Sequence, residues 1–150
     1  MILDPYVSGV LKKSPYADKK VVKGNIVVIL SSIIENRGLN LIIPHSRVIK
    51  RNEVHELMNT SEENAAPGEV VNRVAYIGFF EVNEGGVILT GDDVYIEGKL
   101  IGKVVGFDDT HMPNHQNIVL YSSENNTGLE LKIHLGDKIL FKMAESRKEA

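Results

Sequence analysis

The sequence predicts an all-β fold, mainly antiparallel, built as one small β-barrel domain. Three observations support this prediction. Short apolar runs rich in valine and isoleucine recur along the chain, they follow one another at intervals of roughly 8–12 residues, and clusters of Gly, Asn, Asp or Pro separate them. Helix is expected only near the termini, at Pro5 to Lys13 and in the tail after Met143.

The strands can be placed in order from this pattern. A long apolar run at residues 21–34 ends at a Glu-Asn-Arg-Gly turn, and a short strand at 39–43 stops at Pro44. Residues 47–58 alternate imperfectly, as expected of a strand with one solvated face, and the polar residues 60–68 end in Pro-Gly and predict a loop. The remaining predicted strands are residues 70–82, 87–89, 94–96, 100–107, 118–121, 129–135 and 138–142.

Length and composition limit the classes of protein to consider. The 150 residues suit an N-terminal extension (1–20), a single domain (21–143) and a charged C-terminal tail (144–150). A net charge of −3 argues against bulk nucleic-acid binding, which needs a basic surface. There is no cysteine, which excludes disulfides and thiol chemistry. Because the start lacks a secretory signal and no apolar run is long enough for a membrane helix, we expect a cytoplasmic protein without membrane contact.

The polar loop at residues 106–117 is the strongest candidate for chemistry. Asp108, His111 and His115 lie in it, and Pro113 argues against a helix between the two histidines, so we expect a turn that reverses the chain at Met112 to Asn114. Two imidazoles and a carboxylate could bind a divalent transition metal such as zinc, manganese or iron, or could serve acid–base chemistry without a metal. The third interpretation is structural, with the Asp and Asn side chains binding backbone groups of an irregular loop.

A second polar segment covers residues 45–57. On a strand, alternate residues share a face, so Arg47, Glu53 and His55 are expected on one side. If that side faces a cavity, Arg47 or Arg37 could hold an anionic small molecule, and Glu53 with His55 could support metal or proton chemistry. The alternative is a solvated face of weak ion pairs.

A repeated turn pattern also occurs. Residues 89–96 and 134–141 both read as an apolar segment, Gly-Asp, one spacer residue and a strand. Glycine allows the tight turn and aspartate can bind nearby backbone N–H groups. These segments resemble the Gly-Asp turns of small cradle-like β-barrels, although generic hairpins use the same chemistry.

Several motifs together resemble a known family. Arg37-Gly38-Leu39, Ser46-Arg47, the Glu-Val-His-Glu-Leu of residues 53–57, Ile77-Gly78-Phe79 and the polar loop look like a small prokaryotic family classed as a domain of unknown function. The resemblance covers roughly residues 20 to 142. It implies no activity that could be carried over to this chain.

The leading hypothesis is a small-molecule or metal site where the 106–117 loop meets the 45–57 strand. Asp108, His111 and His115 would be the metal ligands or proton-transfer groups. The ligand-binding residues would be Arg37, Arg47, Glu53, His55 and Asn114. The rival hypothesis is a non-enzymatic assembly or adaptor protein, in which the loop is structural and the strands at 21–34 and 70–82 include a homo-oligomer interface.

Overall fold

The computed structural model describes residues 15–145, which fold almost entirely as β-structure. In chain order, the elements are β1 (Val22–Ile29), β2 (Ile33–Ile34), β3 (Leu39–Asn40), β4 (Ser46–Ile49), β5 (Val54–Thr60), β6 (Val70–Val71), β7 (Val74–Glu84), β8 (Gly86–Leu89), β9 (Asp93–Ile96), β10 (Lys99–Asp108), β11 (Asn117–Tyr121), α2 (Gly128–Leu131) and β12 (Lys138–Lys142). The predicted all-β, mainly antiparallel fold is confirmed. The helix expected at Pro5 to Lys13 and most of the C-terminal tail lie outside the described residues.

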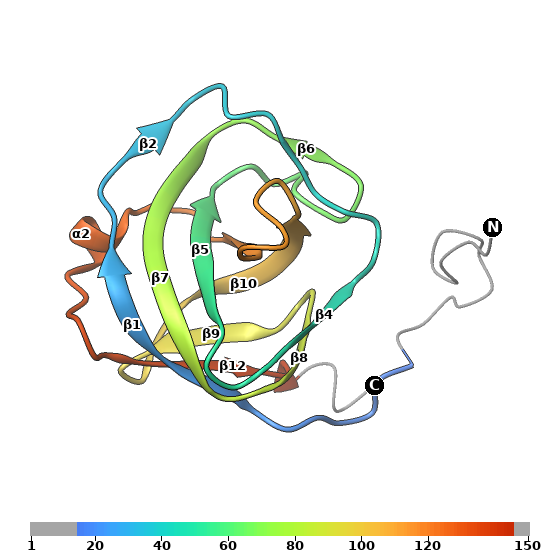
Figure 1. Cartoon of the computed structure of the whole chain (residues 1–150). Helices are drawn as coiled ribbons and strands as arrows, with labels where there is room; N and C mark the ends of the chain where they lie inside the picture. The colour runs from blue at the N-terminus through green and yellow to red at the C-terminus, as the bar shows by residue number, and fades with distance from the viewer. Residues whose placement is uncertain (1–14, 146–150) are drawn as a thin grey trace.

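Seven strands form a closed ring. Their order is β1-β12-β9-β10-β11-β5-β7, and β7 pairs in turn with β1. Figure 1 shows these strands arranged around a common centre. Pairing of the first strand with the last is what closes a barrel. All neighbours in the ring are antiparallel except β11 and β5, which run parallel. The pairs β3–β6 and β4–β8 form separate two-stranded sheets.

The main apolar core lies inside the ring, because every one of the seven strands contributes to it. Phe80, Phe107 and Phe141 are its largest fully buried side chains. Each contributes up to about 3 kcal/mol by leaving water. A second cluster, which includes Leu39, Met58 and Val119, packs outside the ring beneath β3 and β6. The sheet containing β5 and β11 therefore has apolar residues on both faces, and any polar side chain on these strands is buried.

Four of the predicted strands are divided or absent in the structure. Residues 21–34 form β1 and β2, and residues 70–82 form β6 and β7. The strand expected at 47–58 is divided into β4 and β5 by a tight turn, in which Asn52 has a left-handed φ of 75°. The strand expected at 129–135 begins instead with the one-turn helix α2. Thr127 and Glu130 form a capping box there, which satisfies N–H groups at the helix start. A Cβ at Gly128 would lie 1.9 Å from the Ile77 carbonyl oxygen, so only glycine allows this close approach.

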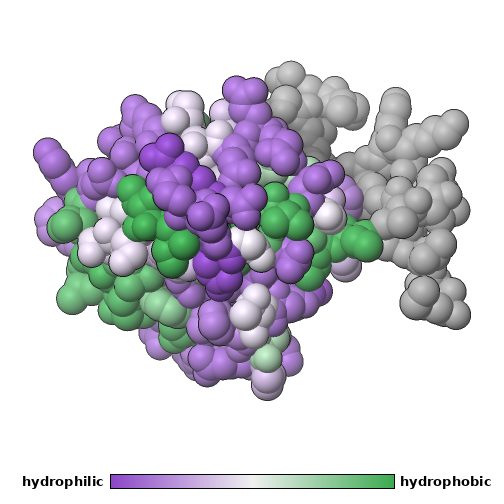
Figure 2. Space-filling model, turned by 90° about the horizontal axis from the view of Figure 1, so that it is seen from above, coloured by the Kyte–Doolittle hydropathy of each residue, from purple (hydrophilic) through white to green (hydrophobic). Residues whose placement is uncertain are grey.

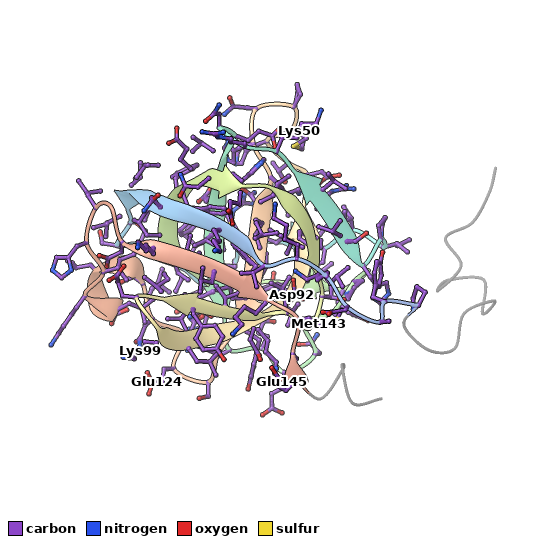
Figure 3. The ribbon with its side chains drawn as sticks, turned by 90° about the horizontal axis from the view of Figure 1, so that it is seen from below. Lys50, Asp92, Lys99, Glu124, Met143 and Glu145 are labelled. Atoms are coloured by element: carbon purple, nitrogen blue, oxygen red, sulfur yellow. The ribbon has the colours of Figure 1, made fainter. Side chains whose placement is uncertain are left out.

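Both Gly-Asp segments form the same turn. Asp92 Oδ2 accepts a hydrogen bond from Leu89 N at 3.0 Å, and Asp137 Oδ2 accepts one from His134 N at 2.8 Å. The two turns differ in their surroundings. Asp92, labelled in Figure 3, is buried and pairs with Lys19 at 2.9 Å. That ion pair attaches the segment before β1 to the first Gly-Asp turn.

Candidate functional site

A turn at residues 109–116, here called the histidine turn, connects β10 to β11. Asp108 Oδ1 accepts a hydrogen bond from Thr110 N at 2.9 Å where β10 ends. The chain then reverses, with Asn114 N donating to His111 O at 2.9 Å and with a cis peptide bond before Pro113. This is the chain reversal expected from the proline. It brings the imidazoles of His111 and His115 into a stack, with their centroids 5.0 Å apart and their planes inclined by 29°.

Gln116 and Arg47 attach the histidine turn to β4. Arg47 donates from Nε to Gln116 Oε1 at 2.8 Å and from Nη2 to Asp109 Oδ2 at 2.7 Å. The buried Gln116 side chain donates in turn to Asp109 Oδ1 at 2.7 Å and to the Asp108 carbonyl at 2.8 Å. The guanidinium of Arg47 is therefore committed to holding the turn in place.

His55 holds the other end of the turn. Its Nδ1 accepts a hydrogen bond from Gln116 N at 2.9 Å, so the ring proton must lie on Nε2 when the ring is neutral. Nε2 then donates to Glu53 Oε1 at 3.1 Å. The same Glu53 oxygen accepts from Lys50 N, and this bond, with smaller contributions from His55, lowers the pKa of Glu53. The expected Glu53–His55 contact forms through Nε2, and with the bond from Gln116 N to Nδ1 both ring nitrogens are used.

Glu56 and His115 make the central contact of the site. The parallel register places Asn117 of β11 beside Glu56 of β5. Asn114 Nδ2 lies 2.9 Å from His115 Nδ1, which makes Nδ1 an acceptor and leaves Nε2 to donate to Glu56 Oε1 at 3.3 Å. The second oxygen of Glu56 has no hydrogen-bond partner among residues 15–145. Only 5% of Glu56 is exposed, so this carboxyl group is both buried and incompletely bonded.

The electrostatic environment favours the uncharged forms of both groups. Burial raises the pKa of Glu56 to about 7; Arg37 opposes this change and Asp108 adds to it. Burial also lowers the pKa of His115, with further contributions from His111 and His55. Although the two groups lie within ion-pair distance, these shifts describe a neutral hydrogen-bonded pair. With a pKa of about 7, Glu56 is present near neutral pH in both its protonated and its ionised form.

An open hollow of about 380 Å³, here called the Glu56 hollow, lies beside this pair. Glu56 and the rings of Tyr76, Phe79 and His111 line it, together with residues of the 30–34 segment. Arg37 is not one of the lining residues, but its Nε donates to the hydroxyl of Tyr76, which is, at 2.8 Å. A larger hollow of about 480 Å³ lies beside the 63–67 loop, but its lining is mostly aliphatic, and its Lys103 is paired with Asp93.

Comparison with protein families identifies the chain. The model of DUF6917, a family of unknown function, matches residues 16–142. The chain belongs to this family. The resemblance to a family without known function is thereby confirmed. No curated protein and no solved structure matched the DUF6917 chain, so its kinship with cradle-like barrels stays a prediction. Every residue of the Glu56 hollow lies within the matched range.

The proposed metal ligands of the DUF6917 chain do not converge. Asp108 Oδ1 is bound to Thr110 N and to Asn117 Nδ2, at 2.9 and 3.1 Å. The imidazoles of His111 and His115 are stacked, so the lone pairs in their planes do not point to a common centre. Within residues 15–145, no group of three or more His, Asp or Glu side chains is placed to hold a metal ion. The metal assignment stays a prediction.

The other expected residues of the DUF6917 site divide into two groups. Arg47 and His55 contact the histidine turn and Asn114 lies in it, whereas Arg37 bonds to Tyr76, which lines the hollow. Glu56, Gln116 and Tyr76 were missed. For Glu56 the local sequence carries no distinct signal, because Glu53, His55 and Asn59 beside it are polar as well. Gln116 and Tyr76 carry no signal either, because their roles depend on which strands pair.

Among the described residues of the DUF6917 chain, no helix has the length and apolar character needed to cross a membrane.

Proposed function

We propose that the chain binds a small anionic molecule in the Glu56 hollow and exchanges a proton with it through Glu56. One observation carries this proposal. A buried carboxyl group, bonded through one oxygen to His115, lines an open hollow together with three aromatic rings. Burying a carboxyl group that lacks a full set of hydrogen bonds is costly for folding, and perturbed titratable groups in clefts cluster at functional sites. Pockets that combine an apolar lining with a few polar groups are typical of small-molecule sites.

Arg37 supports the choice of an anion. Its Nε is used by the Tyr76 hydroxyl, but the guanidinium has no ion-pair partner among the described residues. It lies close enough to Glu56 to lower the pKa of that carboxyl group. The remaining guanidinium nitrogens can therefore bind a carboxylate or phosphate of the ligand. Arg47, the other candidate, is neutralised by Asp109 and serves the turn instead.

Glu56 supports the proton exchange. A group with a pKa near the working pH is present both as acid and as base, which is the condition for efficient proton transfer. His115 fixes one carboxyl oxygen and the other remains available to a ligand. The imidazole of His111 lines the hollow and has no side-chain hydrogen bond among residues 15–145, so its ring nitrogens are available to a ligand.

The test is NMR titration of labelled protein with a panel of small carboxylates and phosphates. Binding should shift the signals of Glu56, Phe79 and His111, and Arg37→Met should weaken it at least tenfold, whereas Arg51→Met, at an exposed arginine, should not. Glu56→Gln should change the pH dependence of binding, whereas the exposed Glu69→Gln should not. If no compound shifts these signals at millimolar concentration, the proposal is overturned.

A metal-bound form of the same site is the alternative version. Zinc, manganese or iron at Asp108, His111 and His115 would require Asp108 to release Thr110 N and the stacked rings to turn. Elemental analysis of untagged protein decides between the versions. Stoichiometric metal, with a rise in melting temperature when it is added back, supports the metal form. Its absence supports the metal-free form.

Self-association is a second candidate function, favoured by one observation. Val27, Val28, Ile33 and Ile34 of β1 and β2 are each about 40% exposed, and β2 pairs only with β7. On the face seen in Figure 2, however, polar side chains divide the apolar residues into separate patches. Light scattering after size-exclusion chromatography tests this candidate. A dimer that Ile33→Lys converts to a monomer would support it, and a monomer at all concentrations would contradict it.

A further inference from the structure

The rings of Tyr76, Phe79 and His111 line the Glu56 hollow, and their arrangement restricts what can bind there. The His111 ring is stacked on His115, with 5.0 Å between centroids, and Phe79 meets His115 edge-on at 5.1 Å and 76°. One face of His111 is thus covered by His115. His111 also lines the hollow and is exposed, so the face of its imidazole turned away from His115 can receive another flat group.

The rest of the lining is consistent with a flat, apolar ligand body. Leu30 and Ile34 supply aliphatic side chains, and Tyr76 supplies a third ring. A volume of about 380 Å³ lies at the small end of the range known for ligand pockets, which is about 300–1,000 Å³. A ligand of one or two fused rings matches this space better than a nucleotide does.

The positions of Arg37 and Glu56 indicate where the charged group of a ligand would lie. Arg37 binds the hydroxyl at the edge of the Tyr76 ring. A ligand ring packed beside Tyr76 would therefore place a substituent within reach of the guanidinium. A planar carboxylate can accept two parallel hydrogen bonds from such a group. Glu56, from its own side of the hollow, then faces the ring or a substituent on it.

From this arrangement we infer that the ligand is an aromatic carboxylate, with its ring stacked on His111 and its carboxylate bound by Arg37. The inference rests on the proposed function, and it names the class of ligand. Stacking of aromatic rings contributes about 0.5–1.5 kcal/mol beyond the burial of area. An aromatic ligand should therefore bind about 3- to 10-fold more tightly than a saturated molecule of the same carbon skeleton.

The experiment compares 2-naphthoate with decahydro-2-naphthoate on the full-length protein. Isothermal titration calorimetry gives the two affinities, and NMR maps the binding site. We expect tighter binding of 2-naphthoate, upfield ring-current shifts of its protons, and chemical-shift changes at His111 and Tyr76. His111→Leu keeps an apolar side chain without a ring, so it should reduce the affinity for 2-naphthoate to that for the saturated acid. Arg37→Met should weaken the binding of both acids at least tenfold.

The possible outcomes separate this inference from the proposed function. If both acids bind in the hollow with equal affinity and His111→Leu has no effect, the aromatic inference is overturned, while an anion site remains. If 2-naphthoate shifts only residues of the larger hollow, such as Tyr121 and Val105, the inference is also overturned. If neither these acids nor any other small anion shifts Glu56 or His111, the proposed function itself fails.

Discussion

His115 donates a hydrogen bond from Nε2 to Glu56 Oε1 at 3.3 Å, and through this contact the histidine turn meets β5. The pair is shielded from water, since Glu56 is 5% exposed and the side chain of His115 is 12% exposed. Burial acts on the two groups in opposite directions, raising the pKa of the acid and lowering that of the base. The stability of the fold should therefore depend on pH through both residues.

Glu56→Gln should make the protein more stable than the wild type at high pH. In the unfolded chain Glu56 ionises near pH 4.5, but in the fold only near pH 7. Between these values the folded state binds more protons, so the free energy of unfolding of the wild type falls as pH rises. The glutamine does not ionise, so the variant keeps this part of its free energy of unfolding. Between pH 4.5 and 7.5 its stability relative to the wild type should therefore rise by up to about 3 kcal/mol.

Denaturant unfolding at several pH values measures this difference. His115 contributes the opposite slope in both proteins, because its lowered pKa makes stability fall as pH drops below 6.5. Subtracting the variant curve from the wild-type curve removes this shared contribution. Glu69→Gln, at an exposed carboxylate, serves as the control. A difference that stays constant with pH would show that Glu56 ionises normally in the fold.

His55 should be locked in one tautomer, with the proton on Nε2. Its Nδ1 accepts from Gln116 N, and no other acceptor for that N–H is present among the described residues. His55→Leu leaves this buried N–H unsatisfied and should cost about 1–3 kcal/mol. His55→Asn places an oxygen near the position of Nδ1 and should cost less. Nitrogen-15 NMR of the ring checks the tautomer. Equal destabilisation by both substitutions would argue that packing, and not this hydrogen bond, makes His55 important.

Arg47 should stabilise the histidine turn more through Gln116 than through Asp109. The Arg47–Asp109 ion pair is partly exposed, with 31% and 39% of the two side chains accessible, so Asp109→Asn should cost no more than about 1 kcal/mol. Gln116 is buried and joins Arg47, Asp108 and Asp109. Gln116→Leu removes the partner of Arg47 Nε, of Asp109 Oδ1 and of the Asp108 carbonyl oxygen, and should cost about 2–3 kcal/mol. Thermal unfolding of both variants measures the contrast, and a larger loss for Asp109→Asn would reverse this assignment.

The sequence predicted the parts of the site that depend on local chemistry. Pro113 marked the reversal that stacks His111 on His115, and the contacts of Arg47 and His55 with the loop follow from the expected meeting of two polar segments. Glu56 was missed for a reason beyond the local sequence. It is buried because β5 pairs in parallel with β11 and has apolar layers on both faces, and neither property can be seen in residues 53–57 alone.

The apolar pattern of the sequence was also insufficient for the strands predicted at residues 47–58 and 129–135. Asn52 is compatible with a strand of alternating residues, and only its left-handed conformation in the folded chain separates β4 from β5. Thr127 and Glu130 do carry a capping signal that could have been recognised, because Thr-x-x-Glu is typical of a helix start. The apolar alternation after residue 129 outweighed it in the prediction. Here local capping and the close contact of Gly128 with Ile77 decide the structure.

The two Gly-Asp turns permit a matched test of the buried Lys19–Asp92 pair. Asp92→Asn and Asp137→Asn both weaken the same turn hydrogen bond, at Leu89 N and at His134 N. Only the first also leaves Lys19 as a buried cation, since its side chain is 7% exposed and that of Asp92 is 1% exposed. Removing one partner of a buried ion pair costs about 3–5 kcal/mol. Asp92→Asn should therefore destabilise the fold by at least about 2 kcal/mol more than Asp137→Asn, as measured by denaturant unfolding. Equal losses in the two variants would mean that Lys19 finds water when its partner is removed, and that the turn hydrogen bond alone accounts for the role of Asp92.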